Sequence, residues 1–252
     1  MALPAAVPHA CDRVALSTAD GVGLVADHYR ASGIPRGAVA LLHGFAGSRR
    51  QPEVVGQAQA LAAAGFGVLV PDSRGHGESG GLCTLGDHEQ HDAAATVAWL
   101  RARHDHVVVA GASMGAIAAL RYSANFGHRD GVVAVSGPSA WRLPLNIRGV
   151  MSVMLTRTWL GRRLAASLLG VRVSSEWAGS ESPLELVRRI SAPVAVIHGQ
   201  RDRIIAAQAA HELHAAVAEP RRLEIVERMS HAFQPTGFAA VCTAVAWTAQ
   251  AP

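Results

Sequence analysis

The hydrophobic positions of the chain form short apolar runs that alternate with longer stretches of helical character. The runs are rich in Val and Leu, as expected for strands buried on both faces of a parallel sheet. The predicted strands are Ala38 to Leu42, Gly67 to Val70, His106 to Ala110, Gly131 to Val135, Val194 to Ile197 and Leu223 to Val226. The predicted helices are Glu53 to Ala64, Asp87 to Arg103, Met114 to Phe126, Ala206 to Ala218 and Phe233 to Ala249.

A different pattern precedes these alternating elements. Two extended segments, Arg13 to Thr18 and Gly23 to Arg30, flank the turn signal Asp20-Gly21, which predicts an antiparallel hairpin. The regular alternation after it predicts an α/β fold with a mostly parallel, doubly wound sheet covered by helices on both faces. Ligands of such sheets bind beyond the carboxyl ends of the strands.

One segment, Gly137 to Ser182, interrupts the alternation. It is too long for an ordinary connection, and segments of this length usually carry function or structure of their own. We expect a helical cap over residues 137–182, inserted into a core of residues 1–136 and 183–252. Three of the five tryptophans lie in this segment, and an apolar lid favours an acyl chain or an aromatic ester as substrate. The residues expected to bind it are Phe45, Trp141, Met151 and Trp159.

Composition excludes several classes of protein. The net charge is +4, and neither a basic stripe with interleaved aromatics nor a nucleic-acid-binding module is present, so no nucleic acid is expected as a partner. The cysteines, Cys11, Cys83 and Cys242, show no metal-ligand spacing and predict no disulfide framework. The sequence shows no secretory signal and no run long enough to span a membrane. We therefore expect a cytoplasmic protein, and the sequence leaves a homodimer open.

The sharpest chemical signal is the string Gly111-Ala112-Ser113-Met114-Gly115, between a predicted strand and a predicted helix. Small flanking residues are needed where a chain turns this tightly from strand to helix, since side chains there would collide with the backbone. Such a turn lifts the serine hydroxyl off the sheet. The pattern predicts that Ser113 is a nucleophile.

With this motif, nearly the whole chain resembles the α/β-hydrolase superfamily, most of all its serine-aminopeptidase-like and monoglyceride-lipase-like serine hydrolases. The resemblance implies the α/β-hydrolase fold and hydrolase activity. Four further segments carry it: Leu41 to Phe45 at the family's oxyanion loop, Pro71 to Ser79 at its DxRGxGxS loop, His198 to Asp202 at its triad acid and Ser230 to Phe233 at its triad histidine.

The residues themselves support a general base at His231. A serine hydroxyl is a poor nucleophile at neutral pH and needs an adjacent base to accept its proton. His231 lies in a loop after the last predicted strand, at the same sheet edge as Ser113. His43 and His198 lie at strand ends, where packing or loop hydrogen bonds are their expected roles, and a structural role is also expected for His76.

A carboxylate beside the histidine fixes its tautomer and stabilises the imidazolium that forms during attack. Asp202 has the position for this role, and the alternative is that it caps the following helix. Asp72 is the second candidate, but its proximity to Arg74 in the same loop predicts an internal ion pair. The chain order Ser, Asp, His is that of the α/β-hydrolase fold.

The tetrahedral intermediate of acyl transfer carries a negative oxygen that needs positioned donors. By resemblance to the family, these are the backbone N–H groups of Phe45 and Met114. The side chains at these two positions are expected to line the pocket.

The predicted reaction is hydrolysis of a carboxylic ester or thioester with an apolar acyl or aromatic part, through an acyl-enzyme. The substrate is expected to be a small molecule. Because the expected cap contains several arginines, a substrate that carries a carboxylate or phosphate is an open alternative. Cleavage of an amide, a peptide or a carbon–carbon bond on the same triad is the alternative, as is a non-catalytic binding module on this fold. Neither HExxH spacing nor a nucleotide-binding glycine motif is present, so no metal and no cofactor is expected.

Overall fold

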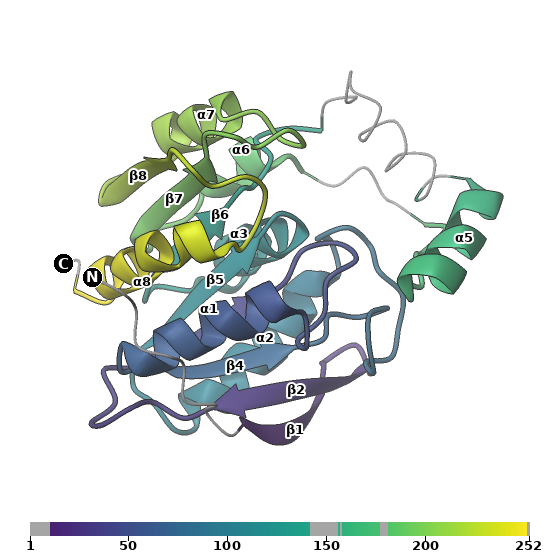
Figure 1. The fold of residues 1–252 in the computed structure, drawn as a ribbon, viewed down its shortest axis with the longest axis horizontal. Coiled ribbons are helices and arrows are strands. Elements are labelled where there is room, and N and C mark those ends of the chain that lie inside the picture. Colours follow the sequence, from purple (N-terminus) through teal and green to yellow (C-terminus); the bar gives the residue numbers. More distant parts are fainter. Residues whose placement is uncertain (1–10, 142–155, 157, 177–180, 251–252) are drawn as a thin grey trace.

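The computed structural model describes residues 11–141, 156, 158–176 and 181–250 of the chain. Its centre is an eight-stranded sheet in the order β1-β2-β4-β3-β5-β6-β7-β8 (Figure 1). The strands are β1 (Cys11–Ser17), β2 (Gly23–Tyr29), β3 (Ala38–Leu42), β4 (Gly67–Pro71), β5 (Val107–Ala112), β6 (Val132–Val135), β7 (Val194–Gly199) and β8 (Arg221–Val226).

Strand direction follows the sequence prediction. β1 pairs with β2 in antiparallel register, with Ala15 opposite Val25, and β2 pairs with β4 in the same sense. All other neighbouring strands are parallel. The structure thus confirms a mostly parallel sheet with an N-terminal antiparallel hairpin.

Helices cover both faces of the sheet. On one face, α1 and α8 lie side by side, and on the other face lie α2, α3, α6 and α7 (Figure 1). Because side chains alternate along a strand, Val108 packs on the α1 side and Val109 on the α3 side. The helices are α1 (Pro52–Ala63), α2 (Glu89–Arg101), α3 (Met114–Phe126), α5 (Trp159–Leu169), α6 (Pro183–Val187), α7 (Gln208–Ala216) and α8 (Phe238–Thr248).

The predicted helix Phe233 to Ala249 is too long at its start. A 3-10 turn, η1 (Pro235–Gly237), precedes α8, which begins at Phe238. The residue before a proline avoids the helical region, and Gln234 is extended, with φ −140° and ψ 152°. His231 therefore lies in a loop of its own between β8 and η1.

Four loops meet at the carboxyl edge of the parallel strands. They follow β3, β5, β7 and β8, and they carry Phe45, Ser113, Asp202 and His231 respectively. The strands β3, β5, β6, β7 and β8 are consecutive neighbours in the sheet. The sheet therefore brings together side chains that are as much as 186 positions apart in the sequence.

The segment 137–182, expected as a cap, lies partly outside the described residues. Its described part contains the helix α5, which Figure 1 shows set apart from the helices on the two sheet faces. Val173, beyond α5, forms a parallel bridge with Cys83 in the loop after β4. Met151 lies outside the described residues, and the role of the segment as a cap stays a prediction.

Candidate active site

Ser113 occupies a strained turn between β5 and α3. Its φ is 55° and its ψ is −113°, in a region that residues with side chains rarely adopt. A Cβ on Gly111 would lie 2.1 Å from the Gly115 carbonyl oxygen, and one on Gly115 would lie 2.4 Å from the oxygen of Leu42. The motif glycines are thus required by close backbone approach, as the sequence predicts. The Ser113 N–H donates to the Val135 oxygen at 2.9 Å, which ties the turn to β6.

Asp202 and His231 are in direct contact. The two atoms that meet, Nδ1 of His231 and Oδ2 of Asp202, are 2.8 Å apart. The second carboxylate oxygen of Asp202 accepts from the backbone N–H groups of Ile204 and Ile205 at 2.8 and 2.9 Å. Burial alone would raise the pKa of Asp202, but the interactions with His198 and His231 and the hydrogen bond from the Ile205 N–H together outweigh burial and hold this pKa well below its usual range. Asp202 is therefore an ionised acceptor for the imidazole N–H.

Ser113 and His231 line one cavity of about 260 Å³. Phe45, from the loop after β3, lies on the wall of this cavity, and its role in binding substrate stays a prediction. A second cavity of about 300 Å³ shares His231 and Ile204 with it and is also lined by Arg201 and Arg203. The remaining lining residues of the first cavity are Gly44, Gly47, Gln51, Glu53, Val54, Ile204, Ala232 and Phe233.

The loop after β3 is fixed by two buried histidines. The Ser73 N–H donates to Nε2 of His43 at 3.0 Å, so the proton of this ring is on Nδ1, which donates to the Gly44 oxygen at 2.8 Å. Burial lowers the pKa of His43 to about 4, so that the ring stays neutral. The Ala46 N–H donates to Nε2 of His76 at 3.3 Å. His43 thus has one of the two roles expected for it, loop hydrogen bonding, and His76 has a structural role.

The two backbone groups expected to bind the oxyanion lie in suitable surroundings. Met114 is the first residue of α3, and the first N–H groups of a helix lack partners within the helix. Within the described part of the chain, neither the Phe45 N–H nor the Met114 N–H has a hydrogen-bond acceptor. The side chains of Phe45 and Met114 pack in one apolar cluster with Cys83 and Val171. Their role as oxyanion donors stays a prediction.

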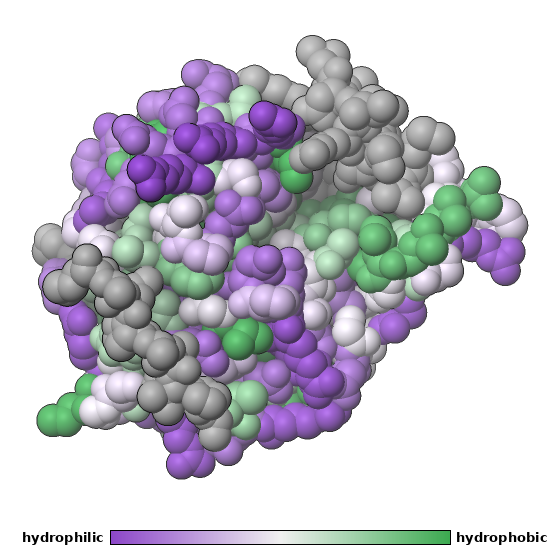
Figure 2. Space-filling view, in the orientation of Figure 1, coloured by the Kyte–Doolittle hydropathy of each residue, from purple (hydrophilic) through white to green (hydrophobic). Residues whose placement is uncertain are grey.

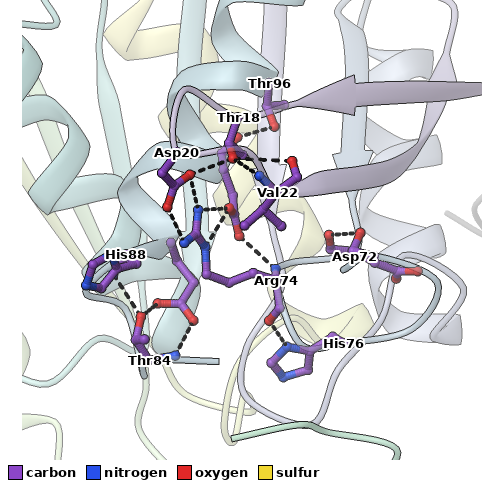
Figure 3. Close-up of polar contacts among 12 residues, drawn as sticks. Thr18, Asp20, Val22, Asp72, Arg74, His76, Thr84, His88 and Thr96 are labelled. Carbon is purple, nitrogen blue, oxygen red and sulfur yellow. Dashed lines mark hydrogen bonds and ion pairs between the residues drawn. The ribbon is translucent and has the colours of Figure 1, made fainter. Parts of the chain in front are cut away.

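The expected ion pair between Asp72 and Arg74 is wrong. Asp72 is fully buried and accepts from the backbone N–H groups of Arg49 and Glu78 at 2.8 and 3.0 Å, and from the Arg49 guanidinium. Arg74 instead binds Asp92, with 2.8 Å between Nε and Oδ1, and Asp20 in the hairpin turn (Figure 3). Both carboxylate oxygens of Asp72 are occupied in this way, which leaves Asp202 as the carboxylate at His231.

Trp141 and Trp159, which were expected to bind substrate, are not among the residues that line this cavity. Trp141 is 36 % exposed and Trp159 is 64 % exposed. Trp159 lies at the start of α5 beneath the guanidinium of Arg163, with 4.7 Å between the Arg163 Cζ and the ring centroid. Figure 2 shows apolar side chains gathered along α5, where Leu168 is 75 % exposed. Their role in binding substrate stays a prediction.

One group of side chains resembles a metal site. Ligand atoms of Asp20, His88 and His91 lie within 4.8 Å of one another. Asp20, however, already accepts two hydrogen bonds from the Arg74 guanidinium (Figure 3), and His88 is the N-cap of α2. Because a guanidinium and a helix N-terminus both disfavour a cation, these residues are a poor fit for a metal ion.

Two features of the site could not be predicted from the sequence. The guanidinium of Arg49 is buried and contacts Asp27, Asp72 and Glu78. In the sequence, nothing distinguishes this buried arginine from its neighbour Arg50. His198 lies 3.3 Å from Asp202, which its position at a strand end did not reveal. The only sequence signal for the contact between His198 and Asp202 was their spacing of four residues at the end of a predicted strand.

Comparison with known protein families and structures gives matches along most of the chain. The sequence model of the alpha/beta hydrolase fold family matches residues 37–190. The uncharacterized protein YqkD of Bacillus subtilis is 30 % identical over 184 residues, which cover 68 % of this chain. The chain spans 58 % of the length of that relative.

Among the described residues, the helices are too short or too polar to span a lipid bilayer.

Solved structures extend the match to the fold. An esterase from Pyrococcus furiosus superimposes with a TM-score of 0.70 and 26 % identity, over 88 % of this chain and 83 % of that one. A hypothetical protein from Pseudomonas aeruginosa gives a TM-score of 0.71 at 19 % identity, over 99 % of this chain and 96 % of that one. The esterase domain of a Rhodothermus marinus protein gives 0.68 at 20 %, over 96 % and 99 %.

Proposed function

The chain belongs to the alpha/beta hydrolase fold family, and on this premise we propose that it is a serine hydrolase of small carboxylic esters or thioesters. The observation that carries the proposal is the 2.8 Å contact between His231 and Asp202 at a cavity that Ser113 also lines. Ester hydrolysis is favoured because a structural neighbour of 26 % identity is an esterase. Within the family, the motifs favour the serine-aminopeptidase-like and monoglyceride-lipase-like hydrolases.

In the proposed reaction, the Ser113 Oγ attacks the ester carbonyl while His231 accepts the hydroxyl proton on Nε2. Asp202 accepts a hydrogen bond from Nδ1 of His231 and stabilises the imidazolium. The carbonyl oxygen becomes an oxyanion that the N–H groups of Phe45 and Met114 stabilise, each contributing about 3 kcal/mol. His231 then protonates the leaving alcohol or thiol, and an acyl group stays on Ser113. Water, activated by the same histidine, hydrolyses this acyl-enzyme.

The segment 137–182 is proposed to act as a cap over the acyl group. The exposed apolar residues of α5 support this proposal, because single exposed leucines are common but a row of them along one helix marks a binding surface. Together with Phe45 and Phe233, such a cap would provide an apolar environment for an acyl chain or an aromatic ring.

A substrate panel tests the proposed reaction. We expect 4-nitrophenyl esters of increasing acyl chain length to be hydrolysed with a clear optimum, and aminoacyl 4-nitroanilides to react at least about 100-fold more slowly in kcat/KM, since amides are the less reactive acyl donors. Steady-state release of nitrophenol and nitroaniline provides the measurement. Faster cleavage of the anilides would identify an amidase or peptidase on the same three residues.

The pH dependence follows from the state of the two ionisable groups. Asp202 stays ionised because its pKa is held below the usual range, so the acid limb of kcat/KM reports the imidazole. Protonation removes the lone pair that must accept the Ser113 proton, and kcat/KM should therefore fall about tenfold per pH unit once the imidazole is mostly protonated. A rate–pH profile that is level down to pH 4 would contradict a histidine base.

A further inference from the structure

The carboxylate of Asp202 faces a second imidazole besides that of His231. Its Oδ1 accepts from two backbone N–H groups, those of Ile204 and Ile205. Its Oδ2 lies 2.8 Å from Nδ1 of His231 and 3.3 Å from Nε2 of His198. One carboxylate oxygen is thus shared by two histidines, of which only His231 lines the cavity that holds Ser113.

The hydrogen bonds of His198 fix which ring nitrogen carries the proton. His198 is 0 % exposed near the end of β7, and its Nε2 lies 3.0 Å from the carbonyl oxygen of Ile205. A carbonyl oxygen only accepts, so Nε2 must be the N–H donor. Among the described residues, no partner contacts Nδ1 of this ring. The described polar contacts of the His198 ring are therefore directed at Asp202 and at the loop that carries it.

These contacts form a closed ring. Ile205 donates its N–H to Oδ1 of Asp202 and accepts the His198 N–H at its carbonyl oxygen, while the same His198 nitrogen faces Oδ2. His198 thus holds the loop backbone that orients the carboxylate and also lies against the carboxylate itself. A side chain without a donor would lose both contacts.

We propose that His198 is a positioning residue of the hydrolase, which shares the charge of Asp202 with His231 and holds the carboxylate in place for it. The inference rests on the proposed function, because it concerns the residue that orients the general base. In agreement with it, burial raises the pKa of Asp202, and the interactions with His198, His231 and the Ile205 N–H together lower it below its usual range.

The sign of the effect follows from electrostatics. A donor at Oδ2 takes up part of the negative charge that would otherwise stabilise the His231 imidazolium. Loss of that donor should stabilise the imidazolium, so His231 should hold its proton to higher pH. The other charged groups that line the cavities at His231 are Glu53, Arg201 and Arg203, and they are unchanged by a substitution at position 198.

Two variants of equal side-chain length separate donation from packing. His198→Gln keeps an N–H donor that can reach Ile205 and Asp202, whereas His198→Met has no donor. The ¹⁵N chemical shifts of the His231 ring, followed by NMR from pH 4 to 9, give its titration midpoint. We expect the midpoint of His198→Met to rise by about one unit and that of His198→Gln to stay close to the parent value. The acid limb of kcat/KM should shift in parallel.

Equal titration midpoints in the parent and both variants, or a midpoint that falls in His198→Met, would overturn the proposal. If His198→Met does not fold, the parent protein alone decides, because the ring ¹⁵N shifts report the tautomer of His198. A proton on Nε2 at neutral pH agrees with the proposal, and a proton on Nδ1 alone overturns it. The titration needs no activity, so a parent protein that hydrolyses no ester would contradict the proposed function while the role of His198 is still measured.

Discussion

Ser113→Ala is expected to lower kcat for ester hydrolysis on the order of 10⁴-fold or more, because loss of the nucleophile removes the acyl-enzyme route altogether. The backbone donors and the cavity stay in place, so substrate binding should change little. The same substitution should abolish covalent labelling by a fluorophosphonate, which in the parent adds one phosphonyl group to the peptide that contains Ser113. Nitrophenyl ester kinetics and mass spectrometry of the labelled protein measure the two effects.

Ser123→Ala is the matched control. This serine lies on the same helix, α3, and is buried with its hydroxyl bonded to the Ala119 carbonyl oxygen at 2.8 Å, away from the cavity. It should keep both turnover and labelling. A folded parent protein that resists the fluorophosphonate would contradict the serine mechanism. If it also turned over no ester, and a ligand bound the parent and Ser113→Ala equally well, the non-catalytic binding module would be favoured.

Arg49→Met is expected to lower the free energy of unfolding by about 3–5 kcal/mol, the usual cost of leaving a buried charge without its partner. Arg49 is buried, and its guanidinium contacts Asp27 at 3.1 Å, Glu78 at 2.5 Å and Asp72. Methionine fills a similar volume but leaves the Asp72 and Asp27 carboxylates without a cation. Urea unfolding monitored by circular dichroism gives the free energy.

Arg50 provides the control for this prediction. It contacts the same Glu78 oxygen as Arg49, at 3.1 Å, but its side chain is 66 % exposed. Exposed ion pairs contribute about 0–1 kcal/mol, so Arg50→Met should change stability by less than about 1 kcal/mol. Equal losses for the two variants would show that burial of the ion pair does not determine its contribution.

Most of the fold could be predicted from the sequence because the buried strands are short and almost purely apolar. Ala38–Leu42 and Met114–Phe126 have the predicted bounds. The errors lie at element ends, as at Pro235, where a local backbone preference interrupts an apolar pattern that continues on both sides. Apolar periodicity reports burial, and it carries little information about the residue at which a helix begins.

The location of the candidate site could also be predicted, since parallel strands bring their following loops to one edge. Ser113, Asp202 and His231 lie at that edge, and Asp202 contacts His231. Their chemical roles stay predictions. The partners of Asp72 and the contact of His198 with Asp202 could not be predicted. The sequence does not reveal whether a charged or polar side chain is buried, or which of several partners it contacts. For Trp141 and Trp159, the prediction of a role in substrate binding rested only on the composition of the segment 137–182.

The way in which the sheet assembles the candidate site has a consequence for partly folded states. Phe45, Ser113, Asp202 and His231 follow four different strands, and no two of them are joined by a short stretch of chain. Detachment of β7 and β8 would separate the acid and the base from the serine while much of the secondary structure survived. Only molecules with the complete sheet can hold these groups together. The proposed hydrolytic activity should therefore be lost in partly folded molecules that still retain much of their helix content.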